Sequence, residues 1–170
     1  ERQVLEGVDG IHRIGGQMPM AVRRMSHNAS LEGDWLFIDP DIIIQRDVQD
    51  VFDKAFDVAL TDRIGTDMEG TPYGLAMPIN LGVAFSRSPR FWELVLNHLR
   101  QLSPQLQHWA GDQLIVCELL KNRLANDFAV KILPGLRFNY PPLSMADPLI
   151  ADAALLHFKG ARKLFLKEAA

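Results

Sequence analysis

Short apolar segments alternate along this chain with segments whose apolar residues recur at helical spacing. The apolar segments are rich in β-branched and aromatic residues and lack the two-residue alternation of half-exposed strands, which is typical of strands covered on both faces. Strands that alternate with helices predict an α/β fold, with a mixed, mostly parallel sheet flanked by helices and ligands at the carboxyl ends of its strands. The expected strands cover residues 8–14, 35–38, 56–60, 79–85, 130–133 and 154–158.

Three segments show helical spacing. The clearest begins at Pro89, a residue favoured at the first helical position, and places Phe91, Val95 and Leu99 on one stripe. Residues 61–77 are polar, contain glycines and show no periodicity, which indicates a long loop of the kind that is usually functional or mobile. The expected helices cover residues 20–29, 89–102 and 113–124.

The composition is that of one globular domain. Of the 170 residues, 48% are apolar and 23% are charged, so residues 1–170 are expected to form a single domain with one core. The net charge of -3 argues against nucleic acid as a partner. Cys117 is the only cysteine, which excludes an internal disulfide. Because no apolar run is long enough to span a membrane and no signal pattern is visible, we expect a cytoplasmic protein without a membrane span.

Two carboxylates follow the expected strand 35–38 directly, in the sequence Asp39-Pro40-Asp41. In an extended chain, residues two apart project from the same face, so both carboxylates are expected at the carboxyl edge of the sheet. Carboxylates this close repel each other unless a divalent cation or a shared proton lies between them. The spacing therefore indicates a cation site, and an ordinary polar turn after a strand is the alternative.

A basic segment follows the last expected strand and reads HFKGARK, residues 157–163. His157 offers an imidazole, which is a ligand for transition metals, and Gly160 lets backbone amides approach an anion. Lys159, Arg162 and Lys163 add three positive charges. This combination is typical of a phosphate-binding segment, and a solvent-exposed basic end of the chain is the alternative.

Two further segments carry polar residues at expected element positions. One face of the strand 79–85 carries large apolar side chains, whereas the other carries Asn80, Gly82 and Ala84 and leaves room for a ligand. The same small residues also suit a strand that packs closely against a helix. Asp112 precedes the helix 113–124 and is expected as its N-cap.

Taken in order, these four segments resemble the motifs of the GT-A glycosyltransferases, and in particular of glycosyltransferase family 8, the group of glycogenin and the bacterial lipopolysaccharide galactosyltransferases. The resemblance covers residues from about 20 to 167. The family opens with a strand whose loop holds the nucleoside base, and only about one strand and one helix are expected before Asp39, so the chain is N-terminally short by this comparison. The matching segments are residues 35–41 (strand and D-x-D), 79–83 (asparagine-glycine strand), 111–113 (aspartate-glutamine helix start) and 157–163 (histidine-glycine-lysine signature).

The resemblance implies a metal-dependent hexosyltransferase that uses a nucleotide-sugar donor, with uridine as the expected base, and an acceptor that the sequence does not identify. It implies that Asp39, Asp41 and His157 bind the cation. The mixture of carboxylate and imidazole ligands favours Mn²⁺, with Mg²⁺ as the alternative. The cation would stabilise the negative charge that develops on the leaving nucleoside diphosphate.

The resemblance also implies functions for five further residues. Gly160 and Lys163, with Lys159, would hold the donor diphosphate, and Asp39 would also contact the donor. Asn80 and Asp112 would contact the sugar or the acceptor. Asp112 could act as a general base for inversion or orient the sugar in a retaining reaction, and the family favours retention. Residues 61–77 are expected on the acceptor side, with Arg63 as a candidate anion contact.

Two other functions fit part of the sequence. A haloacid-dehalogenase-type phosphatase also carries Asp-x-Asp after an apolar strand, where the first aspartate attacks phosphorus and the second protonates the leaving group. That function leaves residues 157–163 without a purpose. A non-catalytic module that binds nucleotide sugars is the third alternative, since it needs the cation site but not turnover.

Overall fold

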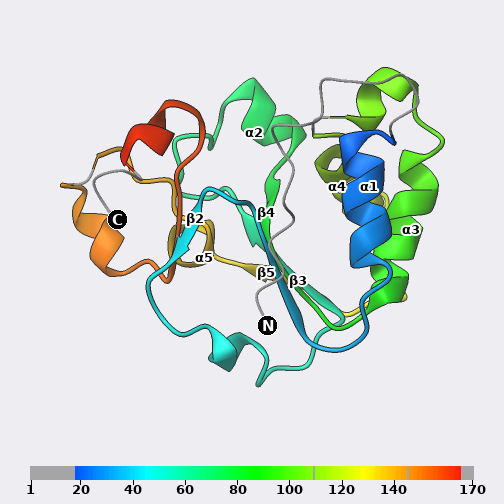
Figure 1. Cartoon of the computed structure of the whole chain (residues 1–170), viewed down its shortest axis with the longest axis horizontal. Helices are drawn as coiled ribbons and strands as arrows, with labels where there is room; N and C mark the ends of the chain where they lie inside the picture. The colour runs from blue at the N-terminus through cyan, green and yellow to red at the C-terminus, as the bar shows by residue number, and fades with distance from the viewer. Residues whose placement is uncertain (1–17, 109, 145, 166–170) are drawn as a thin grey trace.

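The computed structural model describes residues 18–108, 110–144 and 146–165 (Figure 1). The expected strand at 8–14 lies outside the described residues. The strands are β1 (Trp35–Ile38), β2 (Ile42–Ile44), β3 (Val58–Asp62), β4 (Ile79–Ser86), β5 (Val130–Leu133) and β6 (Leu155–His157). The helices are α1 (Met20–Asn28), α2 (Pro72–Ala76), α3 (Pro89–Leu99), α4 (Gly111–Lys121) and α5 (Gly135–Phe138), with 3-10 turns η1 (Gln49–Val51), η2 (Pro104–Gln107), η3 (Pro148–Ala151) and η4 (Gly160–Phe165). The expected α/β class with a mixed sheet flanked by helices is confirmed.

The main sheet has the strand order β1-β4-β3-β5. Strand β4 is antiparallel to both β1 and β3, and β3 is parallel to β5. The described part of the sheet is therefore mainly antiparallel, which differs from the parallel majority expected from the sequence. A strand without alternation indicates that both of its faces are covered and not which way it runs. The connection from β3 to β4 holds only the short α2 and returns the chain in the opposite direction.

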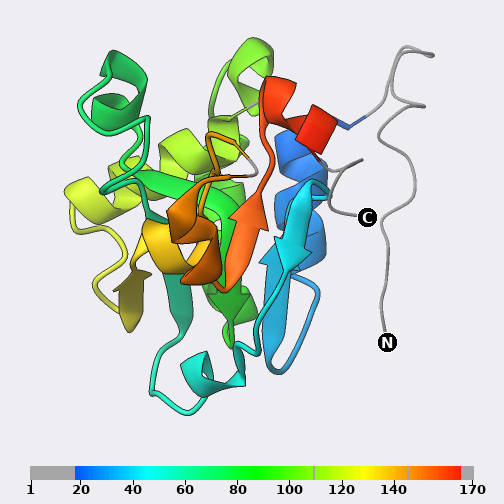
Figure 2. The same cartoon turned by 90° about the vertical axis from the view of Figure 1, so that its left-hand side faces the viewer.

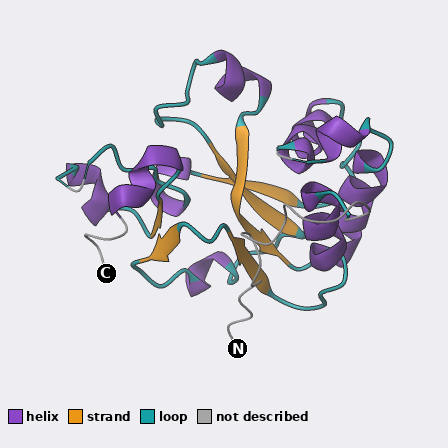
Figure 3. Ribbon diagram, turned by 45° about the horizontal axis from the view of Figure 1, so that its top comes forward, coloured by secondary structure: helices purple, strands orange, loops and turns teal. Residues whose placement is uncertain are grey.

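Each face of the main sheet is covered by a different layer. Helices α1, α3 and α4 pack on one face, at the right of Figure 1, around Leu60 and Leu81. Strand β6, α5 and the segment around η1 cover the other face, against Val83 and Phe85. Figure 3 shows the four strands between these layers. All eight residues of β4 are buried as a result, which explains its apolar sequence.

Helix α3 shows how the sequence produces this packing. It begins at Pro89, as expected, and buries Phe91, Trp92, Val95 and Leu99 against the sheet. Each of these side chains contributes about 1.5–3 kcal/mol by leaving water. The indole Nε1 of Trp92 donates to Ser86 Oγ at 2.8 Å, so the one polar atom of that ring is satisfied in the core.

A second, two-stranded sheet joins the Asp-x-Asp segment to the basic segment. Strand β2 pairs with β6 in antiparallel register, with Ile42 opposite His157, and the N–H of Phe158 donates to the carbonyl of Asp41 at 2.9 Å. The chain around Tyr140 runs along the other side of β6. There the N–H of His157 donates to the carbonyl of Tyr140 at 2.7 Å. Figure 2 shows β2 and β6 side by side. This small sheet brings residues 41 and 157 together.

Several expected boundaries change in the structure. The expected loop 61–77 contains the end of β3 and the helix α2, whose start is capped by Thr71: its Oγ1 accepts from the N–H of Gly74 at 3.0 Å. Helix α4 runs over Gly111–Lys121 and starts before the expected residue 113.

None of the helices in the described part of the chain combines the length and the apolar character that crossing a membrane requires.

Candidate functional site

The Asp-x-Asp segment leaves β1 through a turn. The N–H of Asp39 donates to the carbonyl of Gly82 on the neighbouring strand (2.8 Å), and the N–H of Ile42 donates back to the carbonyl of Asp39 (3.2 Å). Pro40 occupies the second position of this turn, which its fixed φ favours. The expected extended geometry is therefore wrong at Asp41. The two carboxylates still point to one place, because the turn leads directly into β2.

Both carboxylates meet the imidazole of His157. Its Nε2 lies 3.2 Å from Asp41 Oδ1 and 3.7 Å from Asp39 Oδ2. One donor atom from each of the three residues lies within 4.8 Å of the others. His157 is only 4% exposed, whereas the carboxylates remain partly accessible. The structure thus brings together the three residues expected to bind a cation.

A buried amide fixes the orientation of this imidazole. Oδ1 of Asn139 lies 2.7 Å from His157 Nδ1, and Nδ2 of Asn139 faces Thr61 Oγ1 (2.7 Å) and the carbonyl of Asn80 (3.3 Å). Because a carbonyl can only accept, the atom of Asn139 that faces Asn80 must be the amide nitrogen. Nδ1–H of His157 then donates a hydrogen bond to Oδ1 of Asn139, and Nε2 is directed at the carboxylates.

The donor set fits a divalent cation. The carboxylate oxygens can only accept, so Nε2 of His157 beside them requires either a proton or a cation in the cluster. Two carboxylates and an imidazole are ligands that transition metals accept, and the second imidazole nitrogen is hydrogen-bonded, as it is in most metal sites of proteins. Among the described residues, no other group of histidine, cysteine and acidic side chains has this spacing.

Gly82 provides the space in which His157 and Asp39 meet. A Cβ at this position would lie 2.4 Å from His157 Cε1 and 3.0 Å from Asp39 Oδ2. The small face expected on β4 is wrong, because a register shift breaks the alternation: Leu81 packs with Ala84 in one core cluster, whereas Val83 and Phe85 pack in the other. At Gly82 the room is taken by the imidazole and not by a ligand. The lack of a side chain at Gly82 is therefore what lets His157 and Asp39 come together.

Arg24 of α1 links the cluster to Asp112. Its Nη1 lies 3.5 Å from Asp39 Oδ1 and 3.5 Å from Asp112 Oδ2, and its Nη2 donates to the carbonyl of Leu81. Asp112 is 5% exposed in the first turn of α4, where the helix dipole stabilises a negative charge. It is not the expected N-cap. That position belongs to Ala110, which has a left-handed φ of 62°.

Asn80 lies beside the cluster and is 6% exposed. Its Oδ1 accepts from a backbone N–H of its own strand at 3.0 Å, and its carbonyl accepts from Thr61 Oγ1 at 2.8 Å. The register between β3 and β4 shifts here, and the N–H of Leu81 donates to Gln113 Oε1 at 3.1 Å. Sequence reasoning missed Gln113, although it stands in the quoted segment 111–113, and it missed Arg24 and Asn139, which no motif marks.

The basic segment divides between two places. Lys163 Nζ lies 3.2 Å from Asp41 Oδ2, and Arg162 pairs with Asp67 at 2.5 Å. Gly160 has a φ of 57°, a conformation that favours glycine, where the chain enters η4. Burial alone would raise the pKa of Asp41, but hydrogen bonds and positive charge from the imidazole and from Lys163 outweigh burial and hold that pKa below its ordinary value.

Lys159 lies apart from these pairs and is half-buried. Burial, and then the positive charge of Arg63, lower the pKa of Lys159 to about 8. Arg63 is 6% exposed, its Nε donates to the carbonyl of Met77 at 2.8 Å, and its guanidinium carbon lies 5.1 Å from the centre of the Tyr73 ring. Two positive charges therefore lie close enough to repel each other.

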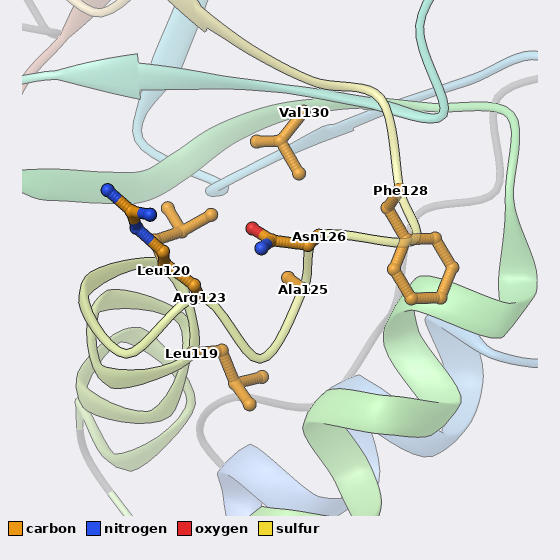
Figure 4. A pocket seen from close by; sticks show the side chains of 7 residues that line it. All are labelled: Leu119, Leu120, Arg123, Ala125, Asn126, Phe128 and Val130. Carbon is orange, nitrogen blue, oxygen red and sulfur yellow. The ribbon is translucent and has the colours of Figure 1, made fainter.

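Two hollows on the surface lie away from this cluster. A hollow of about 220 Å³ lies at the C-terminal end of α4 (Figure 4), whereas Asp112 is in the first turn of that helix. Its lining contains no candidate site residue. The lining residues are Leu119, Leu120, Arg123, Ala125, Asn126, Phe128 and Val130.

Comparisons with known proteins give likeness at the level of structure. No protein-family model and no curated protein sequence matches the chain. A glycosyltransferase involved in the glycosylation of the major capsid of PBCV-1 matches with a TM-score of 0.61 and 15% identity, over 92% of this chain and 79% of that one. The glycosyltransferase GlyE of Streptococcus pneumoniae TIGR4 matches with a TM-score of 0.58 and 19% identity, and its apo form with 0.57 and 20%. Each GlyE match covers 91% of this chain and 43% of GlyE. At these identities the likeness establishes a shared fold.

Proposed function

We propose that this chain is a glycosyltransferase that moves a sugar from a nucleotide-sugar donor to an acceptor and needs a divalent cation to do so. The likeness of its fold to solved glycosyltransferases supports this function. The observation that carries the proposal is the convergence of Asp39, Asp41 and His157 on one point. A departing nucleoside diphosphate gains negative charge, and a cation held at this point would stabilise it.

The cation we propose is Mn²⁺, with Mg²⁺ as the alternative, because the ligand set mixes carboxylate oxygens with an imidazole nitrogen. The orientation of His157 by Asn139 supports a metal ligand, since Nε2 is directed at the carboxylates. The proposed donor is a uridine diphosphate sugar. The choice of uridine depends on the resemblance to glycosyltransferase family 8 alone.

Lys163 is the residue proposed to bind the donor diphosphate, with Gly160 beside it. In the structure the ammonium of Lys163 pairs with Asp41 at 3.2 Å, and the side chain is 58% exposed. Once Asp41 serves as a metal ligand, Lys163 is free to turn to the phosphate oxygens. The exposed stem of Lys163 and the positive φ of Gly160 support such a movement.

Asp112 and Asn80 are proposed to orient the transferred sugar. The Asp112 carboxylate is held by Arg24 at 3.5 Å and is nearly buried. The pairing with Arg24 holds this carboxylate in place, which supports an orienting function. The retaining mechanism and the hexosyl transfer are proposed from the resemblance to glycosyltransferase family 8 alone. Nδ2 of Asn80 has no partner in the described residues and can donate to a sugar hydroxyl.

The two alternative functions receive less support from the site. The phosphatase mechanism described above uses two aspartates and assigns no function to His157. In the structure, however, His157 contacts both carboxylates of the cluster. A non-catalytic binding module would show the same cluster, so turnover must separate it from an enzyme.

The experiment is a panel of nucleotide sugars incubated with the protein and Mn²⁺, followed by detection of the released nucleoside diphosphate. We expect slow hydrolysis of one donor, dependent on Mn²⁺ and absent from Asp41→Ala. Binding of uridine diphosphate with Mn²⁺ but no release from any donor would leave the binding module as the function. Release of inorganic phosphate from phosphate esters would support the phosphatase.

A further inference from the structure

Arg63 carries a positive charge into a nearly buried position without a counterion. It follows β3, is 6% exposed, and uses only its Nε in a hydrogen bond, to the carbonyl of Met77. Among the described residues no carboxylate lies within 4.0 Å of its guanidinium. Among the described residues, Ser26 Oγ is the only fully buried side-chain nitrogen or oxygen that lacks a hydrogen-bond partner, so no nitrogen of Arg63 belongs to that class. The terminal nitrogens of Arg63 form no hydrogen bond with the described residues and are not completely buried.

Lys159 places a second positive charge near the first. Within the described residues its ammonium also has no carboxylate within 4.0 Å, and the charge of Arg63 acts on it directly. The negative charge of Asp67, on the loop that carries Arg63, acts on both cations, but its carboxylate forms its ion pair with Arg162 at 2.5 Å. That ion pair joins the loop to η4, just beyond Lys159.

Buried hydrogen bonds hold the segments of the two cations together. Asn139 bridges Thr61 and His157, with 2.7 Å to each. Arg63 follows Thr61 by two residues, and Lys159 follows His157 by two residues. The fold thus keeps two like charges close in a partly desolvated place, where their repulsion is stronger than in water. Packing of Arg63 on Tyr73 does not explain the second cation beside it.

We infer that Arg63 and Lys159 form an anion subsite that binds a carboxylate or phosphate group of the acceptor. A guanidinium binds two oxygens of such a group at once, and an ammonium adds a point charge. The assignment to the acceptor rests on the proposed function, in which Lys163 serves the donor diphosphate. It moves Lys159 from the diphosphate, where the family resemblance puts it, to the acceptor side. The acceptor is then an acidic sugar, such as a uronic acid, or a phosphorylated one.

The subsite can be tested without donor, metal or turnover. The full chain is titrated with inorganic phosphate in the presence of EDTA, and binding is followed by backbone-amide NMR shifts. We expect Arg63→Gln and Lys159→Gln each to lower the phosphate affinity about tenfold, the loss typical of one charge-assisted contact. Arg90→Gln, an exposed arginine of α3, is the control and is expected to leave the affinity unchanged.

Two results would overturn the inference. One is an unchanged phosphate affinity in both Arg63→Gln and Lys159→Gln. The other is a loss of affinity confined to Lys163→Gln, which would mean that the phosphate occupies the diphosphate side. If Arg63→Gln does not fold, Lys159→Gln decides the matter, because Lys159 is half-buried and forms no ion pair with the described residues.

Separate measurements test the proposed function and the acceptor assignment. Binding of uridine diphosphate with Mn²⁺ is measured in the same variants, and its absence from the wild type would contradict the proposed function while leaving the phosphate result standing. Once a donor is known, Lys159→Gln is expected to raise KM about tenfold for an acceptor that ends in glucuronate and not for its glucose counterpart. An equal effect on both acceptors would show that the anion of the subsite does not belong to the acceptor.

Discussion

The two sides of the site differ in how their charges are balanced. On the acidic side every carboxylate has a positively charged neighbour, whereas on the basic side Arg63 and Lys159 have no counterion among the described residues. The acidic side is therefore balanced by charges of the protein itself, and the proposed cation would replace one of these partners. The basic side keeps a repulsion that an anion would relieve. The acidic pairs are Asp41 with Lys163, and Asp39 and Asp112 with Arg24.

The largest effect is expected when the acidic side loses Asp41. Asp41→Ala removes a cation ligand and the partner of Lys163, so we expect donor hydrolysis to fall by roughly 10²- to 10³-fold. In thermal melts, Mn²⁺ with uridine diphosphate should no longer stabilise this variant. Glu93→Ala, at an exposed position of α3, is the control and should keep both properties. Stabilisation by Mn²⁺ that survives in Asp41→Ala would contradict the ligand assignment.

The next effect concerns Asn139, which acts on the cation only through His157. Asn139→Leu removes the acceptor that orients the imidazole, and we expect the Mn²⁺ affinity to fall about 10- to 100-fold, as is usual for such supporting contacts. The loss should vanish in a His157→Ala background, which a double-mutant cycle of Mn²⁺ dissociation constants measures. Asn122→Leu, at an exposed amide, is the matched control. An equal loss in both backgrounds would mean that Asn139 acts by general destabilisation.

Gly82→Ala tests how closely the acidic side is built. The added Cβ would meet His157 Cε1 at 2.4 Å, so the imidazole must shift away from the carboxylates. We expect the free energy of unfolding to drop by about 1–3 kcal/mol, typical of overpacking, with weaker Mn²⁺ binding in the folded protein. Denaturant titration and Mn²⁺ titration measure the two quantities. Unchanged Mn²⁺ affinity would show that the imidazole position is not set by the space at this glycine.

The smallest expected effect concerns Lys159 on the basic side. Here a substitution is expected to raise the melting temperature, whereas the substitutions on the acidic side are expected to cause losses. Folding lowers the pKa of Lys159 from 10.5 to about 8, so the folded state disfavours the charged form. The resulting cost in the free energy of unfolding is fully present below pH 8. This cost disappears as the pH rises toward 10.5. Lys159→Met should therefore melt a few degrees higher than the wild type at pH 7, with a gain that shrinks as the pH rises. The charged groups that act on Lys159 are Arg63, Asp67, Asp39 and Arg162.

Circular dichroism melts at several pH values measure this difference. Lys121→Met, an exposed lysine of α4, is the control and should not show the gain. A lower melting temperature of Lys159→Met at pH 7 would mean that the basic side is stable without an anion, and the contrast between the two sides would be lost.

Sequence patterns predicted the parts of the molecule that depend on local periodicity. Helix α3 starts at Pro89 and the strand at 35–38 has its expected bounds, because capping, propensity and apolar spacing are properties of neighbouring residues. Strand direction was not predictable in this way. An apolar strand such as β4 has the same sequence whether its neighbours run parallel or antiparallel to it, and the connections decide.

The candidate site shows the same division. Asp39, Asp41 and His157 could be proposed from sequence because each stands in a motif at the end of an expected strand. Arg24 and Asn139 stand in no motif. Each acts through a contact between segments far apart in the chain. Arg24 on α1 reaches Asp39, and Asn139, which follows α5, reaches the imidazole of His157.

The central claim is that Asp39, Asp41 and His157 hold one divalent cation. Electron spin echo envelope modulation of the protein with one equivalent of Mn²⁺ tests it most directly, because a bound imidazole adds a ¹⁴N modulation to the signal. We expect this modulation in the wild type and its loss in His157→Ala. Mn²⁺ that binds without ¹⁴N modulation, or a modulation that persists in His157→Ala, would contradict the account.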